Sequence, residues 1–365
     1  MRMTNHPLAL LAVLSCHCVC LCLEPPPAGK AAPADAGDKP AGDPAAGPSA
    51  GPGQDGPWIR PSGPGAPLIW GRKDGIVFGL PSRGGLRGPR GLVRAGILPE
   101  RKTAPDLINF IAFEPVVGGR KGLSELEPSR LDDVPGKRLS VSGPVEGTLS
   151  KPAPGPGDKE TGDELLVTVL CEPFENGARV RAELRVSADR PEELRITLFA
   201  AEGSAAIEEN TVTATMGNYG RLRRVTLRDR WLDSREVFKG YKGTGFADHP
   251  DFPLGELPRL AGGDVLVAAV TDEKDPAAVK MDGLRTWEYR SVPLTQYWRV
   301  PAREVGPSLR LRLNGRRVYW LSRREIPGGI AFENFELRSR FAAGQTFIFG
   351  LSRRSPVELG VQPGN

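Results

Sequence analysis

The stretch "ARVRAELRVS", residues 178–187, alternates apolar and charged side chains at every position from Val180 to Val186. A period of two is typical of a β-strand with one buried face and one solvated face. The preceding segment "ELLVTVLCEPF", residues 164–174, is separated from it by Glu-Asn-Gly, a short turn-forming sequence. The two segments together therefore predict an antiparallel β-hairpin.

The same pattern recurs on both sides of this hairpin. "LIWGRKDGIVFGL", residues 68–80, contains the turn signal Asp74-Gly75, and "SLRLRLNGRRVYWLS", residues 308–322, contains Asn314-Gly315. Each predicts a further hairpin. No window of a dozen residues shows a convincing helical stripe, and 122–134 is the best candidate for a short helix. The sequence thus predicts an all-β fold, a large antiparallel β-sandwich with few or no helices.

Composition divides the chain of 365 residues into segments. Residues 24–67 are rich in Pro, Ala and Gly and lack the apolar residues that a core needs, which predicts a disordered linker. The β-sandwich body is expected over 68–356, with a division into two sub-sheets at a loop spanning 150–163. Residues 357–365 are expected to form a flexible tail.

The N-terminal sequence is typical of an export signal. One Arg precedes an uncharged apolar run that ends at residue 23, so residues 1–23 resemble a signal peptide. Within it, "VLSC" resembles a bacterial lipobox and makes Cys16 a lipidation candidate, while cleavage further along and simple secretion is the alternative. We expect an exported protein, whether periplasmic, on the outer surface or secreted, that meets the membrane only through such a lipid anchor.

Cysteine, histidine and charge exclude several classes of function. Of the five cysteines only Cys171 lies outside the leader, and of the three histidines only His249 does. These counts leave no disulfide framework and no Cys or multi-His metal site, and no cofactor is expected. The 49 basic and 44 acidic residues are mixed along the chain, so nucleic-acid binding is not expected.

The segments "NFIAFEPVVGGRKGLSELE", residues 109–127, and "PGGIAFENFEL", residues 327–337, are similar to those of uncharacterised exported bacterial proteins. The length and strand density of the body also resemble the supersandwich of galactose mutarotase-like proteins and polysaccharide-lyase β domains. The resemblance implies a fold and no activity, because those mutarotases use histidines that this chain lacks.

Two glutamates in these segments, Glu114 and Glu333, are candidate site residues. Strand alternation predicts that Glu333 shares the apolar face with Phe335, whereas Glu336 lies on the opposite face, so the two could not flank one glycosidic bond. A carboxylate on an apolar face is costly unless it is paired. Glu333 is therefore either half of a structural Glu–Arg pair or a carboxylate at the floor of a cleft with a raised pKa.

Aromatic residues beside polar ones suggest a sugar-binding surface, although core packing also explains such clusters. The predicted function is a noncatalytic carbohydrate-binding or structural module whose partner is a polysaccharide or a cell-envelope component. The alternative is a carbohydrate-active enzyme, such as a lyase, a glycosidase or an epimerase-like protein, that acts without histidine. The carbohydrate-binding candidates are Trp298, Tyr297, Gln296, Arg299, Trp287, Tyr219, Asn218, Glu114 and Glu333.

Overall fold

The computed structural model describes residues 53–81, 90–100, 102–139, 145–151, 162–216, 221–272, 293–319 and 324–362. Within these ranges the chain forms two large antiparallel sheets, which confirms the predicted all-β sandwich. The one α-helix among these residues is a single turn, α1 (Ser234–Val237), capped by the side chain of Asp233. None of the described helices is long and apolar enough to cross a membrane.

The first sheet has 11 strands. One of them, β7 (Arg120–Lys121), pairs with β6 beside the main path, which the other strands form. Its spatial order is β1 (Gly53–Asp55), β2 (Trp58–Arg60), β3 (Ile69–Arg72), β4 (Ile76–Gly79), β5 (Leu92–Ile97), β6 (Asp106–Val117), β12 (Glu209–Thr215), β19 (Ala331–Arg340), β18 (Arg310–Arg316) and β15 (Asp251–Pro253).

The second sheet has 9 strands. Its spatial order is β14 (Trp231–Asp233), β13 (Leu222–Thr226), β16 (Val265–Thr271), β17 (Thr295–Val300), β20 (Gln345–Ser352), β11 (Glu193–Ala200), β10 (Val180–Ser187), β9 (Glu164–Leu170) and β8 (Gly147–Ser150). Two short 3-10 turns lie outside the sheets, at Leu254–Glu256 and Ala302–Glu304. The first of them follows β15, which belongs to the first sheet.

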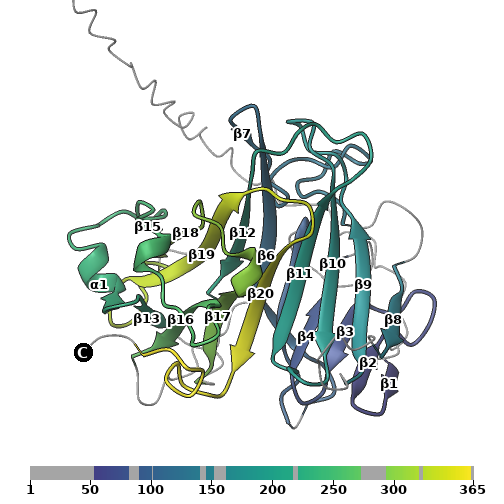
Figure 1. Ribbon diagram of the computed structural model, residues 1–365, viewed down its shortest axis with the longest axis horizontal. Helices are drawn as coiled ribbons and strands as arrows, with labels where there is room; N and C mark the ends of the chain where they lie inside the picture. The colour runs from purple at the N-terminus through teal and green to yellow at the C-terminus, as the bar shows by residue number, and fades with distance from the viewer. Residues whose placement is uncertain are drawn as a thin grey trace, which may run out of the picture. The chain divides into compact units, whose positions relative to one another are not determined.

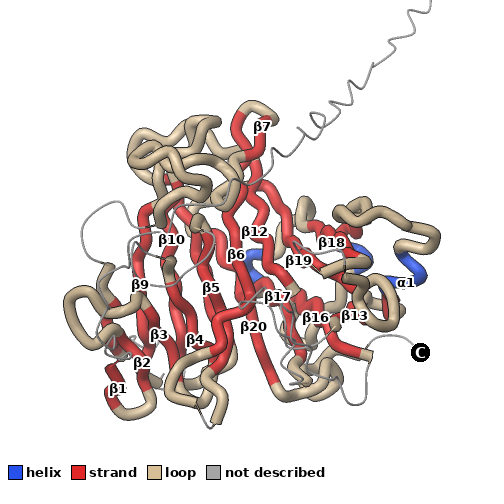
Figure 2. Tube along the Cα trace, turned by 180° about the vertical axis from the view of Figure 1, so that it is seen from behind, coloured by secondary structure: helices blue, strands red, loops and turns tan. Residues whose placement is uncertain are grey.

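The hydrophobic core lies between the two sheets (Figures 1 and 2). In β10 every second residue from Val180 is buried, as the alternation in the sequence predicts, and these side chains join inward-facing residues of both sheets. The hairpin of β9 and β10 is confirmed, with Leu184 opposite Val167. The hairpin of β3 and β4 around Asp74-Gly75 is also confirmed. One large shared core therefore stabilises the fold, and Cys171, the one cysteine among the described residues, is not in a disulfide.

Four expectations about segments are wrong. Residues 53–60, placed in the linker, form β1 and β2, and Trp58 is only 3% exposed. The 150–163 segment does not divide the body, because it joins β8 to β9 and these strands pair with each other. Residues 122–134 form turns rather than a helix. The predicted tail packs on the second sheet as far as it is described, and Val361 is 1% exposed.

Asn314-Gly315 is not a turn either, because β18 runs straight through it. Leu313 pairs with Phe335 and Gly315 with Phe332, so on β19 two residues stand opposite the single residue Asn314. This is a β-bulge. Gly315 is required by packing rather than by a turn, since a Cβ there would lie 2.7 Å from the ring of Phe238.

Candidate functional site

The aromatic cluster predicted around Trp298 belongs to the core. Trp298 is 0% exposed, its Nε1 donates a hydrogen bond of 2.8 Å to the carbonyl of Phe335, and its ring meets that of Phe349 edge-on at 5.2 Å. The strand that carries it, β17, lies between β16 and β20 in the interior of the second sheet. Trp298 therefore has no free face for a sugar, and its interpretation as a binding platform is wrong.

The polar neighbours of Trp298 are also buried and satisfied. Gln296 receives a hydrogen bond from Asn109 and donates one of 2.9 Å to the carbonyl of Thr215. Arg299 pairs with Glu193 on one side and with Asp264 on the other. These contacts are structural, because both residues are at most 5% exposed.

Tyr297 lies on the outer face of the second sheet under the C-terminal segment, next to Val361. Burial raises its pKa, and the charge of Glu193 raises it further, so the phenol stays neutral. Its ring covers Gly350 so closely that a Cβ there would lie 2.0 Å from the ring. Tyr297 is thus part of a second packed layer and not of a binding surface.

Four further candidates fall outside the described residues. They are Cys16, Asn218, Tyr219 and Trp287.

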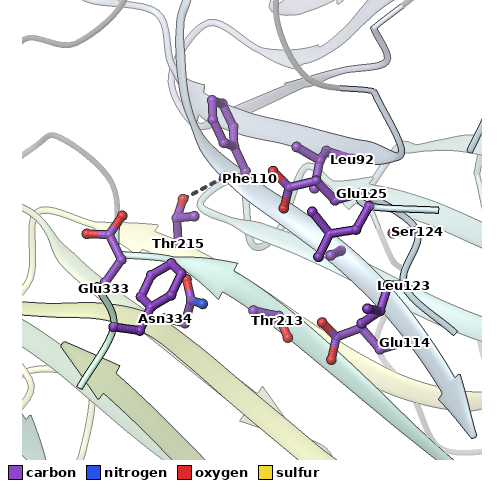
Figure 3. A pocket seen from close by; sticks show the side chains of 13 residues that line it. Leu92, Phe110, Glu114, Leu123, Ser124, Glu125, Thr213, Thr215, Glu333 and Asn334 are labelled. Carbon is purple, nitrogen blue, oxygen red and sulfur yellow. Dashed lines mark hydrogen bonds between the residues drawn. The ribbon is translucent and has the colours of Figure 1, made fainter. Parts of the chain in front are cut away.

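The two glutamates Glu114 and Glu333, by contrast, line one cavity of about 210 Å³ on the outer face of the first sheet (Figure 3). Strands β6, β12 and β19 form its floor, and loop residues complete its walls. The lining residues are Leu92, Phe110, Ala112, Glu114, Leu123, Ser124, Glu125, Leu126, Thr213, Thr215, Phe246, Glu333 and Asn334.

The bulge in β19 places Glu333 in this cavity. Phe332 and Phe335 both belong to the core, so the two residues between them, Glu333 and Asn334, both lie on the outer face. Simple alternation put Glu333 on the apolar face with Phe335, and that prediction is wrong. The side chain of Asn314 stabilises the bulge by accepting a hydrogen bond of 2.8 Å from the Asn334 N–H.

One wall of the cavity is the loop over residues 122–137, which is fixed to the sheet at Ser124. The Ser124 hydroxyl accepts a hydrogen bond from the Phe113 N–H and donates one of 2.6 Å to the carbonyl of Gly91. Gly91 has a φ of +73°, and a Cβ there would lie 1.7 Å from the carbonyl oxygen of Ser124. Only glycine therefore allows the loop to approach β5 this closely.

Glu333 has no partner for its charge among the described residues. Its carboxylate makes no hydrogen bond or ion pair with any residue that the structure describes. Burial raises the pKa of Glu333 to about 7, although the charge of Arg316 opposes the shift. The guanidinium of Arg316 itself lies over the ring of Phe246, 4.9 Å from its centre. Glu333 therefore changes its charge near neutral pH.

The other two carboxylates share this direction of shift. Burial raises the pKa of Glu114, although an ion pair with Lys121 opposes it. The nearby Thr213 also lowers the pKa of Glu114. The Thr213 hydroxyl, however, does not have normal hydrogen-bond geometry to any described residue. Burial also raises the pKa of Glu125, and the charge of Glu114 adds to the effect. The cavity is thus acidic, and its three carboxylates are all partly withdrawn from solvent.

Glu336 lies on the same face but outside the cavity lining. It is 3% exposed, and its Oε1 is 3.4 Å from Nε2 of His249. Burial raises the pKa of Glu336, but the hydrogen bond with His249 and the charges of Lys121 and Arg312 outweigh it, so the net shift is downward. Glu336 is therefore a paired structural carboxylate, and His249 is its partner.

Sequence reasoning missed the hydroxyl and amide groups of the site. Thr211, Thr213 and Thr215 occur at every second position of β12, which pairs on both sides with other strands. A polar face on a central strand is the signal that could have found them, because such a face must either meet solvent or line a polar cavity. Within the described ranges no group of His, Cys, Asp and Glu is placed to hold a metal ion.

No protein-family model and no curated protein matches the sequence.

Proposed function

We propose that the protein is an exported β-sandwich that binds carbohydrate at this cavity without transforming it. The observation that carries the proposal is the composition of the lining, where apolar surface from Leu92, Phe110 and Phe246 adjoins hydroxyl, amide and carboxylate groups. A sugar ring needs both kinds of surface, because it presents C–H groups on its faces and hydroxyls around its edge.

The spacing of Glu114 and Glu333 does not suit glycoside hydrolysis by these two residues. Glu114 lies opposite Thr211, while the backbone of Glu333 bonds to Met216, on the other side of β12. Two strand spacings and five residues of rise place these Cα atoms about 20 Å apart. Glycosidases hold their two carboxyl groups within about 10 Å of each other. Glu114 and Glu333 therefore do not form such a pair.

Phe246 provides a test of the proposed site, because it is 48% exposed and lines the cavity, so its removal should not disturb the core. We expect the Phe246→Ala protein to keep its thermal stability and to lose retention on immobilised polysaccharides. Val357→Ala is the matched control, since Val357 is 61% exposed and is not among the lining residues. Equal retention of both variants and the wild type would refute the assignment of this cavity.

One observation favours a carbohydrate-active enzyme as the second candidate. A carboxyl group with a pKa of about 7, such as that of Glu333, suits a general acid or base at neutral pH. A lyase-like or epimerase-like reaction could use such a single group. Release of new reducing ends, of unsaturated sugars or of epimerised sugar from a polysaccharide panel, abolished in Glu333→Gln, would establish this activity. Binding of the same polysaccharides without product would reject it.

Export and anchoring are a separate part of the proposal, supported by the apolar leader and the "VLSC" sequence. If Cys16 is lipidated, the Cys16→Ala protein should move from the membrane fraction to the soluble fraction. An unchanged distribution would reject the lipid anchor.

A further inference from the structure

The charge of the cavity lining narrows the class of sugar. Three of the 13 lining residues are glutamates, and none is Lys, Arg or His. Figure 3 shows the carboxylate of Glu333 on one side of the cavity and those of Glu114 and Glu125 on the other. Of the three, Glu114 pairs with Lys121, whereas no ion pair joins Glu125 or Glu333 to a described residue. An anionic ligand would therefore be repelled.

The cations near these carboxylates lie outside the lining. Lys121 forms an ion pair with Glu114, and both Arg312 and His249 lie within ion-pair distance of Glu336. Arg316, which attracts Glu333, lies against the ring of Phe246. The cavity thus has carboxylates in its lining and no cationic side chain there, and no described cation forms an ion pair with Glu333.

A second observation is independent of charge. Thr213 is 7% exposed and lines the cavity, and its hydroxyl lies close to the Glu114 carboxylate without normal hydrogen-bond geometry to it or to another described residue. A buried hydroxyl without a partner is rare and costs free energy, so a ligand group that bonds to it would be favoured. The amide of Asn334, on the neighbouring strand β19 and opposite Thr215, offers a further donor and acceptor in the cavity.

We propose that the cavity takes a sugar ring that carries a protonated amine, as in a hexosamine without its acetyl group. The apolar wall around Phe110 would contact the ring, the unpaired carboxylate of Glu333 would accept the ammonium, and Thr213 would bond to a ring hydroxyl. A volume of about 210 Å³ is below the roughly 300 Å³ at which drug-sized sites begin, so the cavity holds about one ring. This inference rests on the proposed function.

The test compares two tetrasaccharides, one of glucosamine and one of its N-acetylated form, by titration calorimetry against the full chain at neutral pH. We expect the free amine to strengthen binding by about tenfold or more, the factor that one charge-assisted hydrogen bond supplies. Glu333→Gln should remove the preference. Glu325→Gln should keep it, because the side chain of Glu325 is 71% exposed and pairs with Arg317 outside the cavity.

The outcomes separate this inference from the proposed function. Equal binding of the two tetrasaccharides would overturn the amine preference and leave carbohydrate binding in place. Binding of neither would overturn both. If 1,5-diaminopentane competed as strongly as the glucosamine tetrasaccharide, the site would be one for organic cations, and the sugar assignment would fail. A preference that survived in Glu333→Gln, with its fold verified by thermal unfolding, would overturn the role of Glu333.

Discussion

Replacing Glu333 by Gln should make the protein more stable, and only at high pH. In the folded state the pKa of this carboxyl is about 7, against an ordinary value of 4.5 in the unfolded chain. A folded state with the higher pKa binds the proton more tightly, so wild-type stability is greatest below about pH 4.5 and falls as the pH rises to 7. Above pH 7 the folded protein holds an ionised carboxylate that is partly withdrawn from solvent and has no ion-pair partner among the described residues.

The size of the effect follows from that difference. Each unit of pKa corresponds to about 1.4 kcal/mol, so the charged form of Glu333 destabilises the fold by up to about 3 kcal/mol above pH 7. Glutamine has nearly the same shape and no charge, and it keeps an amide that the cavity can accommodate. We therefore expect Glu333→Gln to raise the free energy of unfolding by about 2–3 kcal/mol at pH 8 and to change it little at pH 4.5.

Urea unfolding followed by circular dichroism at the two pH values measures this difference. An unchanged slope against urea concentration would show that the two proteins expose the same surface on unfolding. Glu325→Gln, at an exposed ion pair, should change stability by less than about 1 kcal/mol at both pH values. A Glu333→Gln protein that was equally stabilised at both pH values, or destabilised at pH 8, would refute the argument from burial.

Three further predictions concern packing and boundaries. Trp298→Ala should lower the free energy of unfolding by about 3–5 kcal/mol in urea titrations, and a loss below about 1 kcal/mol would contradict its enclosure. Gly91→Ala should displace the 122–137 loop, because its Cβ would lie 1.7 Å from the Ser124 carbonyl oxygen, so amide exchange there should accelerate. Unchanged exchange would show that the loop does not depend on Gly91. Limited proteolysis should leave a fragment that begins before Trp58, whereas a resistant core that began at 68 would contradict the pairing of β2 with β3.

The sequence was sufficient to predict the fold class, because alternation is a local property of each strand. Val180 to Val186 show it in a strand that has one core face and one outer face, and the Asp74-Gly75 turn lies where its dipeptide signal indicates. Such signals need no knowledge of which strands become neighbours.

The site was only partly predictable, because its geometry depends on contacts between distant segments. Glu114 and Glu333 were identified as candidates, but the face of Glu333 depends on the bulge opposite Asn314, which belongs to another strand. The Asn-Gly signal was interpreted as a turn, whereas Asn314 uses its side chain to bond Asn334. Local sequence indicates that a side chain can accept a hydrogen bond, and not which backbone group will donate it.

Trp298 shows the same limit for aromatic residues. Polar neighbours suggested an exposed ring, yet both faces of β17 are covered, one by the core and the other by the C-terminal segment. The buried polar groups beside it find partners such as Glu193, 106 residues away in the sequence. Exposure of one ring is therefore decided by the packing of both layers and cannot be deduced from its own neighbours.

The bulge at Glu333 and Asn334 also gives a criterion for recognising relatives of this protein. Along a regular strand, two side chains on the same face are separated by an odd number of residues, whereas Phe332 and Phe335 are separated by two. A homologous chain with one residue fewer at this point would keep its core and lose either the carboxylate or the amide from the cavity. The length of this interval, more than the identity of its residues, should therefore distinguish homologues that retain the site from those that retain only the sandwich.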